Sequence, residues 1–392
     1  MKKLFVLSAA LLMAVGTFAQ SAYEFTTVKE NPITSIKNQG NSGTCWSFSG
    51  LGFLESEVIR MGKGEHDLSE MYIVRRNYAD KAEKFVRVSG NLNFAQGGSF
   101  ADVIETLNEY GVLPNDAYAG LNYGETMHKH GEVEAGLAGY VKGINENKNR
   151  RISPVWKQGL NGILDAYFGV VPQNFQYEGK SYTAQSLRQS LGLDANNYIS
   201  LTSFTHHPFY APFALEIPDN WRWSLSYNLP IDELMQVFDN AINNGYTIAW
   251  ATDVSEIGFT RNGLAVIPDE EAPENVGSDQ AHWLGLSQNE RNSRLRAKIE
   301  QGPMKEKVIT QEMRQIAYDN QETTDDHGMQ IYGIAKDQNG NKYYIVKNSW
   351  GEAGAYKGIW YASEAFAKYK TMSIMIHKDA LPKDIAKKLG IK

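Results

Sequence analysis

The sequence predicts an α+β fold with two lobes, a helical lobe followed by a β-rich lobe, and a large insertion between them. The first observation is a helical repeat of apolar residues that begins at Cys45, in the stretch CWSFSGLGFLESEVIRMG. The second is a pair of strand patterns near the C-terminus, of which one begins at His327 and the other ends at Asn348. The third is that no repeat, low-complexity tract or long linker separates these patterns, so we expect one continuous domain.

Residues 1–19 have the layout of a secretory signal peptide. Lys2 and Lys3 precede the apolar stretch LFVLSAALLMAVGTFA, and small residues follow it, so cleavage is expected near Ala19. The alternative is an N-terminal membrane anchor, but this stretch is short for a membrane span and no second one follows. We therefore expect an exported protein, periplasmic or extracellular, without stable membrane insertion.

The composition argues against several partners. The chain of 392 residues has a net charge of −6, which removal of Lys2 and Lys3 would change to −8, and its acidic residues are spread along the chain. It has no basic stripe of the kind that binds nucleic acid. No glycine-rich loop lies between a strand and a helix, as phosphate binding requires. We therefore expect no nucleic acid partner and no cofactor.

Cys45 is the only cysteine, so it cannot form a disulfide within the chain. Most free cysteines are small, buried apolar residues. Here the cysteine opens a predicted helix after a loop that contains Gly40 and Gly43. N–H groups at a helix N-terminus lower the pKa of a thiol and favour the reactive thiolate. The side-chain amide of Gln39 and the backbone N–H of Cys45 could together bind an oxyanion.

The two C-terminal strand patterns supply the other groups that a nucleophilic thiol needs. In DDHGMQIYGI, His327 precedes a strand that we expect to be buried mainly on one face. In NKYYIVKNSWG, a second strand ends at Asn348. If the two strands pair, Asn348 can orient the imidazole and Trp350 can shield their hydrogen bond from water. Taken singly, His327 would be a structural or solvated histidine and Asn348 a turn residue.

The stretches QGNSGTCWSFS, DHGM and KNSWG resemble the three signature motifs of the papain-like cysteine peptidases. The resemblance implies a papain-like two-lobe fold, with Cys45 as the nucleophile and His327 as the base. It further implies that Asn348 orients the base and that Gln39 is the oxyanion donor. Thr44 departs from the pattern, in which Ser or Ala precedes the cysteine.

Other stretches extend this resemblance. In FAQGGSF, the pair Gly97 and Gly98 is expected to let the substrate backbone lie close, although an ordinary turn before a helix is the alternative. The cysteine and histidine are 327 − 45 = 282 positions apart, whereas about 130–150 separate them in ordinary relatives. That gap, the lack of disulfides, the lack of a long propeptide and the closing HKDALPKDIAKKLG resemble the bleomycin hydrolase and aminopeptidase C branch. This branch implies a homo-oligomer, a hexamer that encloses its active sites.

The organisation follows from the positions of these motifs. Residues 20–392 form the peptidase domain, in which 20–120 is the helical lobe with the nucleophile and 121–225 is the insertion. Residues 226–392 form the β-rich lobe with the histidine, the asparagine and the C-terminal tail.

The expected activity is hydrolysis of peptide bonds through a thioester, by an aminopeptidase that acts on short peptides. In the branch that the chain resembles, the C-terminal carboxylate pairs with the substrate's α-ammonium, so Lys392 is expected to bind substrate. An endopeptidase or dipeptidyl-peptidase with an open cleft is the alternative. A catalytically silent binding protein on the same scaffold is a further one.

Two histidine pairs are candidate metal ligands. His128 with His130, and His206 with His207, each lack a convincing third and fourth ligand in the sequence. We expect these residues to be solvated loop histidines, and no metal site.

Overall fold

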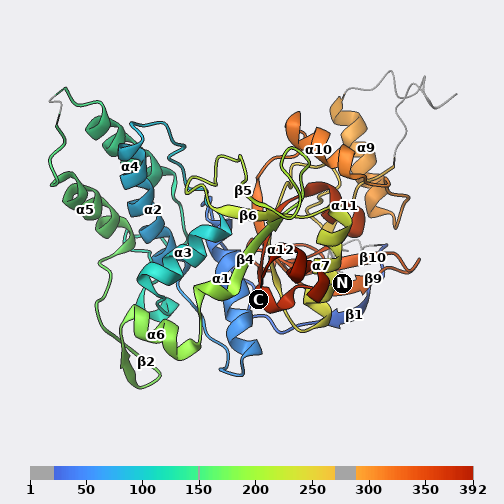
Figure 1. Cartoon of the computed structure of the whole chain (residues 1–392), viewed down its shortest axis with the longest axis horizontal. Coiled ribbons are helices and arrows are strands. Elements are labelled where there is room, and N and C mark those ends of the chain that lie inside the picture. The colour runs from blue at the N-terminus through green and yellow to red at the C-terminus, as the bar shows by residue number, and fades with distance from the viewer. Residues whose placement is uncertain (1–21, 149–150, 270–287, 392) are drawn as a thin grey trace, which may run out of the picture.

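The computed structural model describes residues 22–148, 151–269 and 288–391 (Figure 1). The predicted signal peptide, with its cleavage near Ala19, and the predicted substrate-binding residue Lys392 lie outside these ranges. In the described ranges, every helix is too short or too polar to cross a membrane.

The helical lobe lies on the left of Figure 1 and is built around one apolar core. The predicted helix after the Gly40–Gly43 loop is confirmed as α1, Cys45–Arg60. Residues from all six α-helices of the lobe meet in the core, for example Leu54, Leu137 and Leu164. The other elements of this lobe are α2 (Glu70–Arg87), α3 (Phe100–Tyr110), η1 (Asn115–Ala117), α4 (Gly131–Asn145), α5 (Trp156–Phe168), β2 (Phe175–Tyr177), β3 (Lys180–Tyr182) and α6 (Ala184–Leu191).

The β-rich lobe contains a ten-stranded sheet in the described residues, in the order β5-β6-β4-β12-β7-β9-β10-β11-β8, with β1 paired to β9. Its strands are β1 (Thr26–Glu30), β4 (Tyr198–Thr202), β5 (Pro212–Ala214), β6 (Leu225–Asn228), β7 (Ile248–Thr252), β8 (Leu264–Ala265), β9 (His327–Lys336), β10 (Lys342–Lys347), β11 (Ile359–Ser363) and β12 (Thr371–His377). The helices that accompany the sheet are η2 (Ala195–Asn197), α7 (Ile231–Asn243), α9 (Gln288–Glu300), α10 (Gln311–Asp319), α11 (Glu364–Lys370), η4 (Lys378–Ala380) and α12 (Lys383–Leu389). The predicted α+β two-lobe fold is confirmed.

The predicted division of the chain at 120 and 225 does not match the packing. α4 and α5 add to the core of the helical lobe, whereas β4 pairs with β12 and thereby joins the sheet of the other lobe. β1 also lies in that sheet, although it comes before the nucleophile. The insertion is therefore shared between the lobes, because its helices and strands each bury their apolar face on the nearest existing core.

β9 is buried on both faces, not mainly on one as the sequence suggested. Nine of its ten residues are buried. α7 packs on one face, and α1 covers the first part of the other face, where Tyr332 and Ala335 pack near Phe25 and Ile33. Glycines allow α1 to approach closely: a Cβ at Gly328 would lie 2.8 Å from Ser49 Oγ, and one at Gly52 would lie 3.0 Å from Gln330 Oε1. The first residue of α1 is Cys45 and the first residue of β9 is His327, so this contact positions the predicted nucleophile and base.

Gln330 is the polar connection between α1 and the sheet. Its Nε2 donates to Gly52 O (3.1 Å) and Ser56 Oγ (2.8 Å) of α1 and to Oγ1 of Thr247 (3.1 Å), the residue before β7. We expect Gln330→Leu to lower the free energy of unfolding by about 1–3 kcal/mol, because buried partners lose their hydrogen bonds. Chemical denaturation measures this change.

Gln158→Leu, at an exposed position of α5, is the matched control and should change stability by less than about 0.5 kcal/mol. Equal stability of the two variants would show that these hydrogen bonds do not hold α1 on β9.

Candidate active site

Cys45 begins α1, and the loop before it is held by the segment that carries Gln96. Gly43 N donates to Gln96 Oε1 (2.6 Å), and Trp46 Nε1 donates to Gln96 O (3.0 Å). Ser47 N also closes the first turn on Thr44 O (2.9 Å). Cys45 as a whole residue is half-buried and lies at a helix N-terminus, as predicted.

A short backbone pairing joins the Gln39 loop to the turn that follows β10. Gln39 N donates to Ser349 O (2.8 Å), and Gly351 N donates to Lys37 O (3.0 Å). The Gln39 side chain is anchored on both sides, since Ser349 Oγ donates to its Oε1 (2.6 Å) and its Nε2 donates to Ser42 O (2.7 Å). One N–H of the Gln39 amide is thus used, and its role as oxyanion donor stays a prediction.

The predicted approach of His327 and Asn348 is confirmed. β9 and β10 pair as antiparallel neighbours, and His327 Nε2 lies 2.8 Å from Asn348 Oδ1, with both residues buried. The Trp350 ring lies on the imidazole at a centroid distance of 4.7 Å and an angle of 32°. His327 is buried whereas Trp350 is 37% exposed. The indole ring therefore lies between the imidazole and solvent. With Nε2 bound to Asn348, Nδ1 is the nitrogen left for a proton acceptor role.

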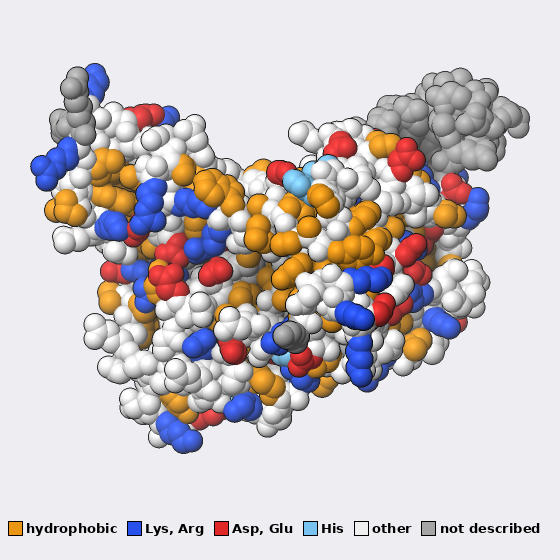
Figure 2. All heavy atoms as spheres, viewed as in Figure 1, with side chains coloured by type: hydrophobic (Ala, Val, Ile, Leu, Met, Phe, Trp, Pro, Cys, Tyr) orange, Lys and Arg blue, Asp and Glu red, His pale blue; other side chains and the backbone are white. Residues whose placement is uncertain are grey.

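Cys45 and His327 line one pocket together with residues of both lobes. On the face that it draws, Figure 2 shows a hollow along the upper edge of the molecule. The backbone N–H of Gly328 faces the thiol and favours its charged form. The remaining residues that line the pocket are Trp46, Gly98, Ser99, Phe100, Ile217, Asp219, Ala251, Asp325, Asp326 and Ser373. Three carboxyl groups therefore surround the predicted nucleophile, which the sequence motifs did not indicate.

Gly97 and Gly98 differ in their surroundings. Gly98 lies in the pocket, where a Cβ would come within 2.8 Å of the Trp46 ring. A Cβ at Gly97 would collide with the carboxylate of Asp219. Asp219 thus occupies the space on the Cβ side of Gly97, and of the two glycines only Gly98 lines the pocket of Cys45. The role of the pair in binding the substrate backbone stays a prediction.

The ionisation of the pocket differs from the sequence prediction. Burial raises the pKa of Cys45 to about 12, and the carboxyl groups of Asp325 and Asp219 add to this shift. Burial lowers the pKa of His327 to about 4, although its hydrogen bond to Asn348 opposes the change. The predicted lowering of the thiol pKa is therefore wrong, because burial and the carboxyl groups outweigh the helix N-terminus. Transfer of the thiol proton to His327 would form both charges together, and each would then stabilise the other.

Residues 215–223, which we call the strap, run beside this pocket from one lobe to the other. On the β-rich side, Leu215 is buried with Phe213 and with Met372 of β12, and the Tyr318 hydroxyl donates to Glu216 O (2.8 Å). This end of the strap is therefore fixed to the sheet.

On the helical side, the strap is held by Asp102, at the start of α3. Trp221 Nε1 donates to Asp102 Oδ2 (3.1 Å), and Arg222 donates to Asp102 Oδ1 (2.7 Å) and to Asp80 Oδ2 (2.7 Å) of α2. Asp219 lies between the two anchored ends. Its contact with the Cys45 pocket was missed from the sequence, because the local stretch PDNWRW gives no indication of its partners.

The sequence suggested that His128 and His130 are solvated loop histidines, and the structure contradicts this. His130 is fully buried, and the His128 ring packs edge-on against Phe48. Burial lowers the pKa of both histidines to about 4. They are packing residues of the helical lobe and face no third ligand in the described residues.

The described part of the C-terminal tail lies on the β-rich lobe. In α12, Ile385 and Leu389 are buried in the core that contains Ile231 of α7. Lys388 Nζ of α12 lies 2.8 Å from Glu233 Oε1 of α7. No tail residue up to Ile391 is among those that line the Cys45 pocket.

Comparison with known proteins supports the papain-like architecture. Residues 20–186 match the model of the papain family cysteine protease, and residues 306–391 match that of the peptidase C1-like family. The first range contains Gln39 and Cys45, and the second contains His327 and Asn348.

Similar proteins and structures cover most of the chain. Aminopeptidase C of Lactobacillus helveticus is 23% identical over 95% of this chain and 87% of its own. Aminopeptidase C of Lactococcus lactis subsp. cremoris is 21% identical over 94% and 86%. The crystal structure of pepw from Lactobacillus rhamnosis HN001 is similar in fold, with a TM-score of 0.68 at 17% identity over 93% of this chain and 84% of that one.

Asp325 offers a test of the pocket's electrostatics. Burial raises the pKa of Asp325 to about 8, with Asp219 and Asp326 adding to the shift, so its side chain is neutral well below pH 8 and charged above it. At pH 9, Asp325→Asn should lower the pKa of Cys45 and speed alkylation by iodoacetamide several-fold. At pH 6, Asp325 of the wild type is as uncharged as the asparagine that replaces it, so the wild type and Asp325→Asn should react at the same rate.

Asp384→Asn, on the exposed face of α12, is the control and should react like the wild type at both pH values. An Asp325→Asn effect that is the same at pH 6 and pH 9 would contradict this explanation of the raised thiol pKa.

Proposed function

For this chain, a papain-like cysteine peptidase, we propose that the activity is that of an aminopeptidase that removes the first residue of short peptides. The curated relatives of similar length are named aminopeptidases. The observation that carries the proposal is the carboxylate of Asp219, which lines the Cys45 pocket and lies against Gly97.

We assign the chemical steps to four residues. Cys45 Sγ attacks the peptide carbonyl carbon while its proton passes to His327, and Asn348 keeps the imidazole in place. The amide of Gln39 and the backbone N–H of Cys45 stabilise the oxyanion. His327 then gives its proton to the leaving amine, and a water that it deprotonates hydrolyses the thioester.

Asp219 is suited to bind the α-ammonium of the substrate. Burial raises the pKa of its carboxyl to about 6, against the opposing effect of Lys81, so it is charged at pH 7. No hydrogen bond to this carboxylate is found among the described residues. A partly buried carboxylate that accepts no hydrogen bond is unfavourable, and a substrate ammonium would donate one to it. A peptide with further residues on that side would meet the strap.

The C-terminal tail was the expected anionic partner of the ammonium. We propose that Asp219 takes this place, because α12 packs on α7 and the described tail residues do not line the pocket. A dipeptidyl-peptidase or an endopeptidase would need open space past Gly97, where the Asp219 carboxylate lies.

Paired fluorogenic substrates, with a free or an acetylated N-terminus, test this proposal. The wild type should prefer the free amine, and its kcat/KM should fall as the pH drops through about 6, since the Asp219 carboxylate is then protonated. Asp219→Asn should lower kcat/KM for the free amine at pH 7 at least tenfold, which corresponds to about 1.4 kcal/mol. The acetylated substrate should be cleaved no more slowly than by the wild type.

Three further proteins make the result decisive. Cys45→Ser is the blank and should be folded but inactive, Asp116→Asn at an exposed position is the charge control, and a chain without residues 389–392 tests the tail. Equal cleavage of both substrates by the wild type would indicate an endopeptidase. Loss of the free-amine preference on truncation, but not in Asp219→Asn, would assign the ammonium site to the tail.

We also propose that the protein is exported after cleavage near Ala19 and acts as a homo-oligomer, a hexamer by resemblance. The signal-peptide layout of residues 1–19 supports the first part. N-terminal sequencing of the protein from fractionated cells should find a chain that begins close to residue 20, and light scattering should give its oligomeric mass. An intact Met1 in the cytoplasm would contradict export.

A further inference from the structure

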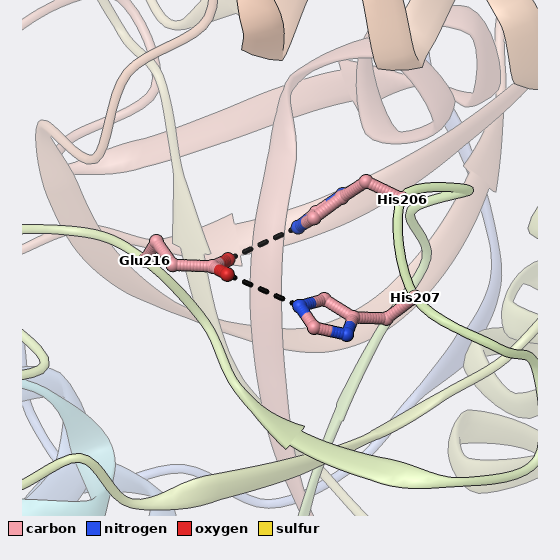
Figure 3. Close-up of side chains that lie close together, drawn as sticks. All are labelled: His206, His207 and Glu216. Atoms are coloured by element: carbon pink, nitrogen blue, oxygen red, sulfur yellow. Dashed lines mark hydrogen bonds and ion pairs between the residues drawn. The ribbon is translucent and has the colours of Figure 1, made fainter.

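Three potential metal ligands meet at the β-rich end of the strap. His206 and His207 lie in the loop before β5, and Glu216 lies just after that strand. His206 Nε2 is 3.0 Å from Glu216 Oε2, and His207 Nε2 is 3.1 Å from Glu216 Oε1 (Figure 3). The sequence showed only the histidine pair, and β5 returns the chain so that the carboxylate faces both imidazoles.

Neighbouring side chains fix the orientation of both rings. The His207 ring stacks on Phe213 at 4.3 Å and 23°, and the His206 ring stacks on Tyr318 at 5.4 Å and 25°. On its other side, His206 Nδ1 lies 3.1 Å from Nε2 and 3.5 Å from Oε1 of Gln315, a buried residue. If Nε2 binds a metal, Nδ1 carries the ring proton and can donate it to Gln315 Oε1, and a metal-binding histidine commonly donates its second N–H to an oxygen atom.

We propose that His206, His207 and Glu216 bind one divalent transition-metal ion of the Zn²⁺ class. Two imidazole nitrogens and a carboxylate are ligands that Zn²⁺, Co²⁺ and Ni²⁺ accept. The ligand atoms all lie within 4.8 Å of one another, so a single ion can reach the three side chains. The cluster is partly exposed, which leaves the remaining coordination positions to water. This corrects the expectation of solvated histidines without a third ligand.

The other group of possible ligands among the described residues does not compete. Glu55, Asp67 and Glu70 also lie close together, but the ammonium of Lys37 occupies their centre, at 2.6 Å from Asp67 and Glu70 and 3.2 Å from Glu55. A cation is thus already supplied by the chain.

A bound ion would fix the strap to the β-rich lobe. Glu216 precedes Ile217, which lines the Cys45 pocket, and Asp219 follows two positions later. The loop of His206 and His207 would then be joined to the strap by coordination bonds, in addition to the hydrogen bond that Tyr318 of α10 donates to Glu216 O. This inference does not depend on the aminopeptidase assignment.

Metal titration of the metal-stripped full chain tests the site. The parent protein is Cys45→Ser, because the thiol and His327 would otherwise offer Zn²⁺ a second site. We expect one equivalent of Zn²⁺ to compete with a chromogenic chelator, and Co²⁺ to give visible absorption bands in the same stoichiometry. Bound Zn²⁺ should also raise the melting temperature.

His207→Gln and Glu216→Gln, each in the Cys45→Ser parent, should weaken binding at least tenfold and abolish the Co²⁺ bands. His128→Gln, which removes a histidine of the other pair, is the matched control and should bind like the parent. Melting curves without metal show whether each variant is folded, and Glu216→Gln, at an exposed position, serves if His207→Gln does not fold. No binding by the parent, or unchanged binding by both ligand variants, would overturn the proposal.

Discussion

The close contact between α1 and β9 is the constraint on which the rest of the site depends. A helix that begins with Cys45 lies on a strand that begins with His327, so the register of this contact sets the distance between thiol and imidazole. Gly52 and Gly328 permit the approach, and Gln330 satisfies polar groups at its centre. A larger residue at either glycine would separate the two lobes at the point where the chemistry takes place.

The sequence predicted those parts of the structure that are local. The helix after Cys45 and the pairing of β9 with β10 follow from apolar periodicity, and three short motifs give the residues that these elements bring together. The failures concern contacts between distant segments. Arg222 meets Asp102, and Glu216 meets two histidines across β5, and no local pattern encodes such pairs. The burial of β9 on both faces was missed for the same reason, since it depends on α7 as well as on α1.

The charge distribution around Cys45 was also beyond local reasoning. A helix N-terminus favours a thiolate, and this effect is readable from the sequence, but Asp219 and Asp325 come from other segments and oppose it. Burial disfavours an isolated charge on either Cys45 or His327. The two charges are therefore expected to form together, and proton transfer between the two residues leaves the net charge of the pocket unchanged. A substrate ammonium beside Asp219 would remove part of the negative potential that opposes the thiolate, so binding and activation of the nucleophile favour each other.

The strap explains why an insertion can define specificity without forming a domain of its own. Arg222 joins it to Asp102 and Asp80 in the helical lobe, through ion pairs with little exposure, and breaking such pairs leaves buried charges behind at a cost of several kcal/mol. The opposite end is fixed to the sheet near β5 and β12. Asp219 is therefore positioned by contacts with both lobes. Cys45 belongs to the helical lobe and His327 to the β-rich lobe. A movement of the lobes relative to each other would therefore change the positions of Cys45, His327 and Asp219 together. The interface that aligns the thiol with the imidazole thus also sets the distance from the thiol to the Asp219 carboxylate, which we assign to the substrate ammonium.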